Sequence, residues 1–475
     1  MIEQRDKAKL YTRRSMLGIL GTAVLAGCSS PLQQTPIKNK TVRDFVATEL
    51  FYIAHRGSGD NWTEHTMTAY RNAVKAGAQA IEVSVHRTSD DVFVCHHDAN
   101  LKRLTGIDLD IAQATALELE GISNDAREWL GPHSGLEPIP TLQEVLDEMP
   151  QECFLFIEDK TGAHAEELLS VLDMVPQGRD RIVWKQNSTA AGYELASARG
   201  YLTWGYFAPD TVMRIAELAG RFDLLGIHDS ATESVLLELT NIGKPIICWE
   251  IHTRWQRDHF LSWGVRGMMC SNYPYVTGFP ARGENLQDSF GTGLRGIGDL
   301  PDAISWAAQP LIIADQEALR ISGEKKSSYT LGSISPGKIV FSELCFSVRW
   351  PQLVAKNHIA GVSFAVPTDA PYRAFEDSQE RGMHIQIETR GEISVWLATE
   401  TGPQRLGRSA IPQGVPGEWA DLTLRSWKSE LQVSVDGWQM DPVEVQENPL
   451  HGYVSLLCLV PQGQPVDFRH VALTA

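Results

Sequence analysis

Short apolar runs alternate with stretches of helical spacing along residues 48–282. The short runs have the length and the β-branched and aromatic content of strands. They lie at residues 51–55, 80–85, 154–158, 181–184, 201–207, 224–228, 246–250 and 267–270, and helical patterns lie at 63–76, 141–149, 163–174, 211–219 and 230–241. Eight strand and helix units predict an α/β TIM barrel, (βα)8, whose functional residues gather at the carboxyl ends of the parallel strands.

A further apolar run, residues 92–96, follows the second strand too closely to be parallel to it. Only residues 87–91 lie between them, whereas a parallel crossover needs about a dozen residues or more. This run is therefore predicted to turn back as a hairpin arm. His97 then returns to about the level of Glu82, and His55, at the carboxyl end of the first strand, can meet it in one pocket.

The second strand separates polar from apolar side chains. Because side chains alternate along a strand, Glu82 and Ser84 share one face, and Ile81, Val83 and Val85 share the other. In a barrel the apolar face packs against the helices, so the polar face is expected to point inward. A carboxylate between two histidines suits phosphoryl transfer.

The last third of the chain has a different pattern. Residues 283–304 are rich in glycine and are predicted to be a linker. Beyond them helical periodicity largely disappears, and alternating runs lie at residues 339–348, 383–389, 393–399, 419–426, 431–435, 453–460 and 466–473. This spacing predicts that residues 305–475 form an antiparallel β-sandwich.

The first residues have the features of an export signal. Arg13 and Arg14 precede a ten-residue apolar run, 17–26, which is too short to span a bilayer, and residues 25–28 read LAGC. The segment looks like a bacterial lipoprotein signal, residues 1–27, after which Cys28 would carry lipid. Residues 28–47 are then a flexible tether. We expect an exported protein anchored to the outer side of the cytoplasmic membrane or in the periplasm; the alternative is a cytosolic chain with a chance resemblance.

Charge narrows the choice of partner. The net charge is −17, and removal of residues 1–27 would take away five basic and two acidic side chains and bring it to −20. Nucleic acid is not expected as a partner, since it needs a basic face. The six cysteines after Cys28 lie in or beside apolar runs, and free buried thiols are favoured over disulfides.

Five motifs stand in a fixed order along the barrel region. They are IAHRG at 53–57, TEHT at 63–66, EVS at 82–84, HD at 97–98 and IEDK at 157–160. In this order they resemble the glycerophosphodiester phosphodiesterase family, over about residues 50–282. The residues that the resemblance carries over are His55 and His97 for acid–base catalysis, Glu82 and Glu158 for one divalent cation (Ca²⁺ or Mg²⁺), and Arg56 and Lys160 for the substrate phosphate.

The chain departs from the family pattern at two places. Ser84 stands where the second carboxylate of the E-x-D motif is expected, so cation affinity should fall unless Glu64 or water fills the gap. Ser271-Asn272 stands where the family has Thr-Asp. Trp249 aligns with a family tryptophan that lines the site, although core packing is at least as common a role for a barrel tryptophan.

Three other polar residues lie near strand ends and are further candidates. Glu250 and His252 alternate on one strand face and could reach the pocket, but a buried, mutually satisfied pair is about as common, and both are left out of the predicted catalytic set. His228, which precedes Asp229 at another strand end, is judged in the same way.

The resulting hypothesis is a cation-dependent, lipid-anchored phosphodiesterase that hydrolyses glycerophosphodiesters to glycerol phosphate and an alcohol in lipid metabolism. A non-catalytic barrel that binds glycerophosphate-containing lipid or wall polymer is the alternative, which the serine at position 84 motivates. The C-terminal region, with LQVSVDGW at 431–438 and VDFRHVALT at 466–474, resembles concanavalin-like or laminin-G-like jelly rolls. That resemblance implies a glycan or wall polymer as a further partner.

Overall fold

A computed structural model describes most of the chain beyond residue 40. The described residues are 41–130, 134–278, 286–288, 290, 310–322, 329–330, 340–352, 357–369, 382–399, 401–412, 418–445, 450–459 and 464–474. The predicted signal segment, Cys28 and most of the predicted linker lie outside these residues. Among the described helices, none has the length and apolar character needed to cross a bilayer.

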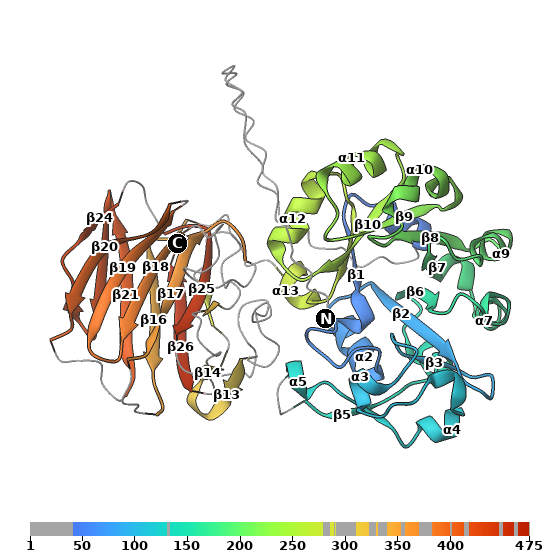
Figure 1. The fold of residues 1–475 in the computed structure, drawn as a ribbon, viewed down its shortest axis with the longest axis horizontal. Coiled ribbons are helices and arrows are strands. Elements are labelled where there is room, and N and C mark those ends of the chain that lie inside the picture. The colour runs from blue at the N-terminus through green and yellow to red at the C-terminus, as the bar shows by residue number, and fades with distance from the viewer. Residues whose placement is uncertain are drawn as a thin grey trace, which may run out of the picture. The chain divides into compact units, whose positions relative to one another are not determined.

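The barrel prediction is confirmed. Among the described residues, eight parallel strands follow one another around the sheet, and β1 pairs with both β11 and β2, which closes the ring (Figure 1). The strands are β1 Phe51–Ala54, β2 Ala80–Arg87, β6 Phe154–Asp159, β7 Ile182–Asn187, β8 Leu202–Phe207, β9 Leu224–His228, β10 Ile246–Ile251 and β11 Gly267–Cys270. The predicted hairpin arm is β3, Phe93–Cys95, and it runs antiparallel to β2.

Helices connect most of the parallel strands. They are α2 Met67–Lys75, α3 Lys102–Thr105, α4 Ala116–Leu119, α5 Arg127–Leu130, α6 Leu142–Glu148, α7 Ala165–Leu172, α8 Gly178–Arg181, α9 Tyr193–Ala198, α10 Ile215–Leu218, α11 Glu233–Asn241, α12 Arg254–Ser262 and α13 Tyr273–Thr277. A small hairpin, β4 Ser123–Asp125 with β5 Leu136–Pro138, extends the long connection after β3. Local sequence fixes several helix starts; Thr141 and Glu144, for example, form a capping box at α6.

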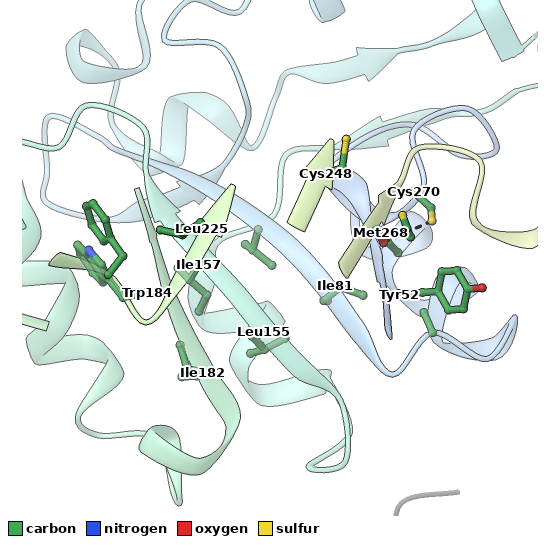
Figure 2. Packing of buried hydrophobic residues seen from close by; sticks show 14 of the residues in the cluster. Tyr52, Ile81, Leu155, Ile157, Ile182, Trp184, Leu225, Cys248, Met268 and Cys270 are labelled. Carbon is green, nitrogen blue, oxygen red and sulfur yellow. Dashed lines mark hydrogen bonds between the residues drawn. The ribbon is translucent and has the colours of Figure 1, made fainter. Parts of the chain in front are cut away.

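Alternate residues of the strands build two separate apolar cores. One set, which includes Ile81, Val83 and Val85 as predicted, packs between the strands and the helices. Figure 2 shows part of this layer, with Tyr52, Leu155, Ile157, Ile182, Trp184 and Leu225. The other set fills the barrel interior and consists of Phe51, Ile53, Ala80, Phe154, Phe156, Val183, Leu202, Trp204, Leu224, Ile247 and Met269.

The barrel interior changes character along the strands. Two residues beyond the apolar inward positions, the same faces carry His55, Glu82, Glu158, Lys185, Tyr206 and Ser271. The amino-terminal end of the barrel is therefore apolar, and the carboxyl end is polar and ionisable.

The end of the predicted tether is folded. Residues 41–47, assigned to a flexible segment, contain helix α1, Val42–Val46, which begins with a capping box between Thr41 and Asp44. Val42, Phe45 and Val46 are buried and belong to the apolar core inside the barrel. The prediction was wrong here because the apolar positions of this short segment find their partners only in the assembled barrel.

The described residues of the C-terminal region form two antiparallel sheets, as expected of a β-sandwich. One sheet contains β12 Leu286–Gln287, β13 Leu311–Ile313, β14 Ala318–Ser322, β16 Glu343–Arg349, β21 Ala420–Trp427, β22 Glu430–Val435, β23 Trp438–Gln439, β24 Val443–Glu444 and β26 Pro465–Thr474. The other contains β15 Tyr329–Thr330, β17 Ile359–Val366, β18 Gly382–Glu388, β19 Glu392–Thr399, β20 Gly402–Ala410 and β25 Tyr453–Leu459. Both sheets contribute to one apolar core.

Two details of this region differ from the sequence prediction. β12 lies within the predicted linker but pairs with β26, and Phe290 is buried in the sandwich core, so the linker region already contributes to the second domain. β17 and β20 were not predicted. β20 has mostly polar and partly exposed residues, and its place at the sheet edge explains the weak pattern.

Candidate functional site

The turn after β1 positions two of the predicted residues. His55 directly follows β1 in a short 3-10 turn, His55–Gly57, in which Arg56 and Gly57 have φ of 53° and 79°. A Cβ at Gly57 would lie 2.8 Å from Cβ of Ala69, so this position has room for glycine alone. The left-handed turn aims the backbone N–H of Arg56 at Glu82, with a bond of 3.0 Å to Oε2.

One pocket at the carboxyl end of the barrel unites four of the six predicted catalytic, phosphate and metal residues. Its lining consists of His55, Arg56, His97, Lys160, Lys185, Tyr206, Trp249, Glu250 and Met269. The return arm thus brings His97 to the same pocket as His55. The other two predicted residues, Glu82 and Glu158, lie beneath the lining and contact it through Lys185.

His55 lies in an environment that keeps its imidazole neutral. Nδ1 of His55 is 3.0 Å from Oγ of Ser271, which leaves Nε2 as the second ring nitrogen for a substrate. Burial and the adjacent Arg56 guanidinium lower the pKa of His55 to about 4, although Glu250, with Oε1 3.9 Å from Nδ1, acts in the opposite direction.

His97 has a charged partner instead. Nδ1 of His97 is 2.7 Å from Oδ1 of Asp98, and Asp98 also accepts a hydrogen bond of 2.5 Å from Nε of Arg103. Burial lowers the pKa of His97, but the Asp98 carboxylate opposes that shift. The two histidines therefore differ in their hydrogen-bond partners: Nδ1 of His55 lies beside the neutral hydroxyl of Ser271, whereas Nδ1 of His97 lies beside the Asp98 carboxylate.

Glu64 supports the cationic side of the pocket. Its carboxylate accepts hydrogen bonds from Arg56, at 3.2 and 3.3 Å, and from Arg103, at 2.6 and 3.3 Å. Burial opposes its ionisation, but the two guanidinium groups outweigh burial and lower the pKa of Glu64 to about 2. Glu64 therefore positions Arg56, and its oxygens are committed to guanidinium groups rather than to the gap that Ser84 leaves.

Three neighbouring strands build a buried ion-pair cluster beneath the pocket, composed of Glu82, Glu158 and Lys185. Nζ of Lys185 is 2.7 Å from Oε1 of Glu82 and 2.6 Å from Oε2 of Glu158. Ser84 donates a hydrogen bond of 2.7 Å to Oε1 of Glu82, and Tyr206 donates one of 2.5 Å to Oε1 of Glu158. Both glutamates are buried, with exposed fractions of 0% and 2%.

Strand register explains this cluster. Ser84 on β2 pairs with Glu158 on β6. Glu158 and Lys185 directly follow the paired residues Ile157 and Trp184 of β6 and β7. Ser84, Glu158 and Lys185 therefore lie at one register level of the barrel, and Glu82 lies two residues earlier on β2, opposite Phe156.

The lysine keeps both glutamates ionised. Burial opposes ionisation of Glu82 and Glu158, yet Lys185 and the other neighbouring cationic and hydrogen-bonding groups together outweigh burial and lower the pKa of each carboxyl group. The same carboxylates raise the pKa of Lys185 against the effect of burial. The cluster thus contains two carboxylates and one ammonium group, with a net charge of −1.

This donor set does not fit the divalent cation implied by the family resemblance. Calcium takes six to eight oxygen ligands, and magnesium takes six in an octahedron, of which one or two are usually carboxylates; neither accepts an ammonium group as a ligand. Here the ammonium of Lys185 lies between the two glutamates, and the neighbouring position on β2 carries the neutral Ser84. Within the described part of the chain, no cluster of three or more His, Cys, Asp or Glu side chains has the geometry to hold a metal ion.

Sequence reasoning missed three residues of the site. Lys185 lies beyond the predicted end of its strand at residue 184, because the polar KQN sequence hid the last residues of β7. Tyr206 lay inside a predicted strand, and alternation alone could have placed it inward. Glu250 was considered and left out, yet it lines the pocket and lies 3.5 Å from Nη2 of Arg56.

The three remaining candidates, Trp249, His252 and His228, differ in their position relative to the pocket. Trp249 lines the pocket. His252 contacts Oδ2 of Asp60 at 2.6 Å and Oε2 of Glu250 at 3.4 Å, so it supports the pocket from behind Glu250. His228 bonds to Oγ of Ser230 at 2.8 Å and is not among the lining residues.

Comparisons with known proteins agree on one family. Residues 55–272 match the model of the Glycerophosphoryl diester phosphodiesterase family. The chain is 41% identical over 68 residues to human lysophospholipase D GDPD1, an alignment that covers 14% of this chain and 22% of that protein. It is 36% identical over 111 residues to a glycerophosphodiester phosphodiesterase of Caldanaerobacter subterraneus, covering 23% of this chain and 45% of that protein.

The matches are partial. The chain spans between 22% and 50% of the length of these and related curated proteins. A solved phosphodiesterase from Oleispira antarctica, in complex with the product sn-glycerol-3-phosphate, aligns with a TM-score of 0.41 and 23% identity over 47% of this chain and 93% of that chain.

Proposed function

We infer that residues 55–272 form a domain of the Glycerophosphoryl diester phosphodiesterase family, as the motifs predicted. From this premise we propose that the chain hydrolyses glycerophosphodiesters to glycerol phosphate and an alcohol, within lipid metabolism. One observation carries the proposal: two histidines and three cationic side chains line a single pocket at the carboxyl ends of the barrel strands. A phosphodiester carries one negative charge, and such a pocket offers it cations and two groups able to transfer protons.

We assign the base to His55 and the acid to His97. When Nδ1–H of His55 donates to Ser271, the basic nitrogen is Nε2, and the low pKa of the ring keeps Nε2 unprotonated. The Asp98 carboxylate stabilises a protonated His97, whose Nε2–H can then be donated. Environments that separate two similar groups in this way support separate acid and base roles.

The reaction then has two proton transfers. Nε2 of His55 takes a proton from the attacking water while the water oxygen forms a bond to phosphorus. The bond between phosphorus and the leaving alcohol oxygen breaks, and Nε2–H of His97 protonates that oxygen. Arg56 and Lys160 balance charge on the phosphoryl oxygens. The divalent cation is left out of this scheme because the donor set does not fit it.

The leaving group distinguishes the two roles. Histidine-to-alanine variants at both positions should hydrolyse glycerophosphocholine at rates lower by about 10² to 10⁴. With a glycerol phosphate p-nitrophenyl ester, whose leaving group needs no proton, His97→Ala should regain most of its rate and His55→Ala should not. Equal recovery of both variants would refute the assignment, and undiminished hydrolysis of glycerophosphocholine by both would refute the enzyme itself.

A binding protein is the second candidate for the barrel. The neutral side chain at position 84 and the lysine between the glutamates motivate it. Purified protein that binds glycerophosphocholine, measured by calorimetry, but releases no glycerol phosphate would favour this candidate.

We also propose that the chain is exported and anchored by lipid at Cys28, on the outer side of the cytoplasmic membrane or in the periplasm. The arginine pair, the apolar run and the LAGC sequence of residues 13–28 support this proposal. Replacement of Cys28 by Ala should move the protein from the membrane fraction to the soluble fraction of a bacterial expression host. Unchanged membrane association would contradict it.

We propose a glycan or wall polymer as the partner of the C-terminal domain. A groove of about 420 Å³ is lined by Ser342, Glu343, Arg425, Ser426, Trp427, Gln432 and Thr474. The Trp427 side chain is 64% exposed and offers an aromatic face beside charged and polar groups. Trp427→Ala should weaken retention on an immobilised cell-wall polysaccharide, while barrel activity stays unchanged.

A further inference from the structure

We propose that Lys185 is a fixed cation that replaces a divalent metal ion, so that this phosphodiesterase works without bound metal. The inference rests on the proposed hydrolysis for its catalytic part. Its structural part, that the pocket binds no divalent cation between Glu82 and Glu158, can be tested without turnover.

The position of the ammonium group is the first argument. Nζ of Lys185 contacts one oxygen of each glutamate, at 2.7 and 2.6 Å. These are the two carboxylates that the family resemblance assigns to the cation. A metal ion between them would have to displace a buried lysine, whose side chain is 8% exposed.

Charge is the second argument. A divalent ion with the three carboxylates of the family pattern carries a net charge of −1. With Ser84 in place of one carboxylate, Glu82, Glu158 and Lys185 also sum to −1. The loss of one acidic side chain and the replacement of a divalent by a monovalent cation therefore compensate each other. Ser84 donates its hydroxyl to Glu82, so the neutral side chain is integrated into the cluster.

The surroundings of the lysine suit an organic cation. Nζ of Lys185 lies 5.7 Å from the ring centre of Trp204 and 5.4 Å from that of Tyr206. Aromatic faces attract an ammonium group, whereas they offer no ligand to calcium or magnesium. The ammonium group of Lys185 is therefore surrounded by two carboxylates and by the aromatic side chains of β8.

The lysine also reaches the substrate side. An ammonium group has three N–H donors, and two are used by the glutamates. Lys185 lines the pocket together with His55, His97 and Arg56, so the third donor can bond a phosphoryl oxygen. A purely structural ion pair would need no place in this lining.

The first experiment uses the unmodified chain. Glycerophosphocholine hydrolysis is measured after treatment with EDTA and dialysis, and again with added CaCl₂ or MgCl₂. We expect the rate to change by less than twofold. Loss of activity after chelation with recovery on adding either salt would overturn the proposal. Absence of hydrolysis under every condition would instead refute the proposed function, and the second experiment would then decide the inference.

The second experiment measures cation binding directly. Calorimetric titration and thermal unfolding with CaCl₂ or MgCl₂ compare the unmodified chain with Glu158→Gln, which controls for weak binding elsewhere on an acidic protein. We expect the same signal from both. Cation binding by the unmodified chain that disappears in Glu158→Gln would overturn the proposal.

A double substitution should create the missing site. Lys185→Met with Ser84→Asp restores three carboxylates and removes the ammonium, so CaCl₂ or MgCl₂ should raise its Tm, and any hydrolysis should become sensitive to EDTA. The matched control is Lys160→Met with Ser84→Asp, because Lys160 lines the same pocket and lies 3.5 Å from Oε2 of Glu158. The control should show no gain in Tm with either salt; an equal gain in both variants would contradict the role of Lys185. If the first variant folds only with added cation, that dependence also supports the proposal.

Discussion

The two ends of the barrel interior are closed by opposite chemistry. At the amino-terminal end, helix α1 and the first inward residues of the strands form an apolar core around Phe45, Phe51 and Phe154. At the carboxyl end, the inward residues two positions further along are ionisable and held by ion pairs and hydrogen bonds. The strands are the same; the difference lies in which residue each strand places inward.

The difference separates stability from chemistry. Burial of apolar area at the amino-terminal end of the barrel stabilises the fold by about 25 cal/mol per Å², and it requires no particular orientation of the groups. The carboxyl end contains charged groups that are removed from water, and such groups contribute little net stability even when they are paired. Changes at one end should therefore alter stability, and changes at the other should alter turnover. The following predictions test this separation in order of expected size.

Removal of the proposed base should have the largest effect. His55→Ala should lower kcat/KM for glycerophosphocholine by about 10² to 10⁴, because no other group replaces its Nε2. The fold should be retained, since Ser271 and Glu250 can be hydrated in the space left. His259→Ala is the control, because His259 stacks on Trp255 of α12 at 4.9 Å and does not line the pocket. If His55→Ala lost folded structure in proportion to its loss of rate, the separation of stability from turnover between the two ends of the barrel would be contradicted.

Truncation of the opposite end should destabilise without slowing the chemistry. Phe45→Ala removes a ring that is 1% exposed and contacts Phe51 and Phe154 at centroid distances of 5.2 and 4.9 Å. The expected cost is about 3 to 5 kcal/mol of unfolding free energy, measured by urea denaturation of the barrel. Activity per folded molecule should stay unchanged. Leu237→Ala, at a half-exposed position of α11, should cost less than about 0.5 kcal/mol.

The pH dependence should follow His55. Its pKa in the folded chain is about 4, below the ordinary 6.5, so the acid limb of kcat/KM should lie near pH 4 to 5. Between pH 6.5 and 4 the unfolded state binds more protons at this residue than the folded state does, so stability falls as the pH is lowered through this range. Protonation of His55 should lower the free energy of unfolding by up to about 3 kcal/mol between pH 6.5 and 4.

The variant His55→Gln isolates that contribution. The difference in unfolding free energy between the unmodified chain and this variant should change between pH 6.5 and 4 and stay constant above pH 7. An acid limb of kcat/KM at pH 6.5 or higher would show that burial and the neighbouring Arg56 do not lower the pKa of His55.

The smallest effect is expected at the cap of α1. Thr41→Ala removes the side chain that accepts a hydrogen bond from the backbone N–H of Asp44. Loss of such a cap costs about 1 kcal/mol, seen as a small decrease in Tm, with kcat unchanged. Thr41→Ser keeps the hydroxyl and should restore most of the stability. An effect on kcat would mean that the two ends are coupled.

Much of the barrel was predictable because strand patterns are local. The positions of all eight parallel strands, the return arm of β3 and the inward face of Glu82 followed from apolar runs, loop length and alternation. The motif order also identified the residues that line the pocket at His55, Arg56, His97 and Lys160. These properties depend on neighbours along the chain, so the sequence records them directly.

The sequence by itself determined the barrel, the order of motifs that residues 55–272 share with the family model, and the place of His55 and His97 in one pocket. Only the tertiary structure decided what lies between Glu82 and Glu158. A lysine on β7 reaches both because β2, β6 and β7 are adjacent strands of the closed ring, and α1 packs where it does because that ring has an apolar interior. Both outcomes depend on contacts between residues far apart in the chain, and such contacts form only when the barrel closes.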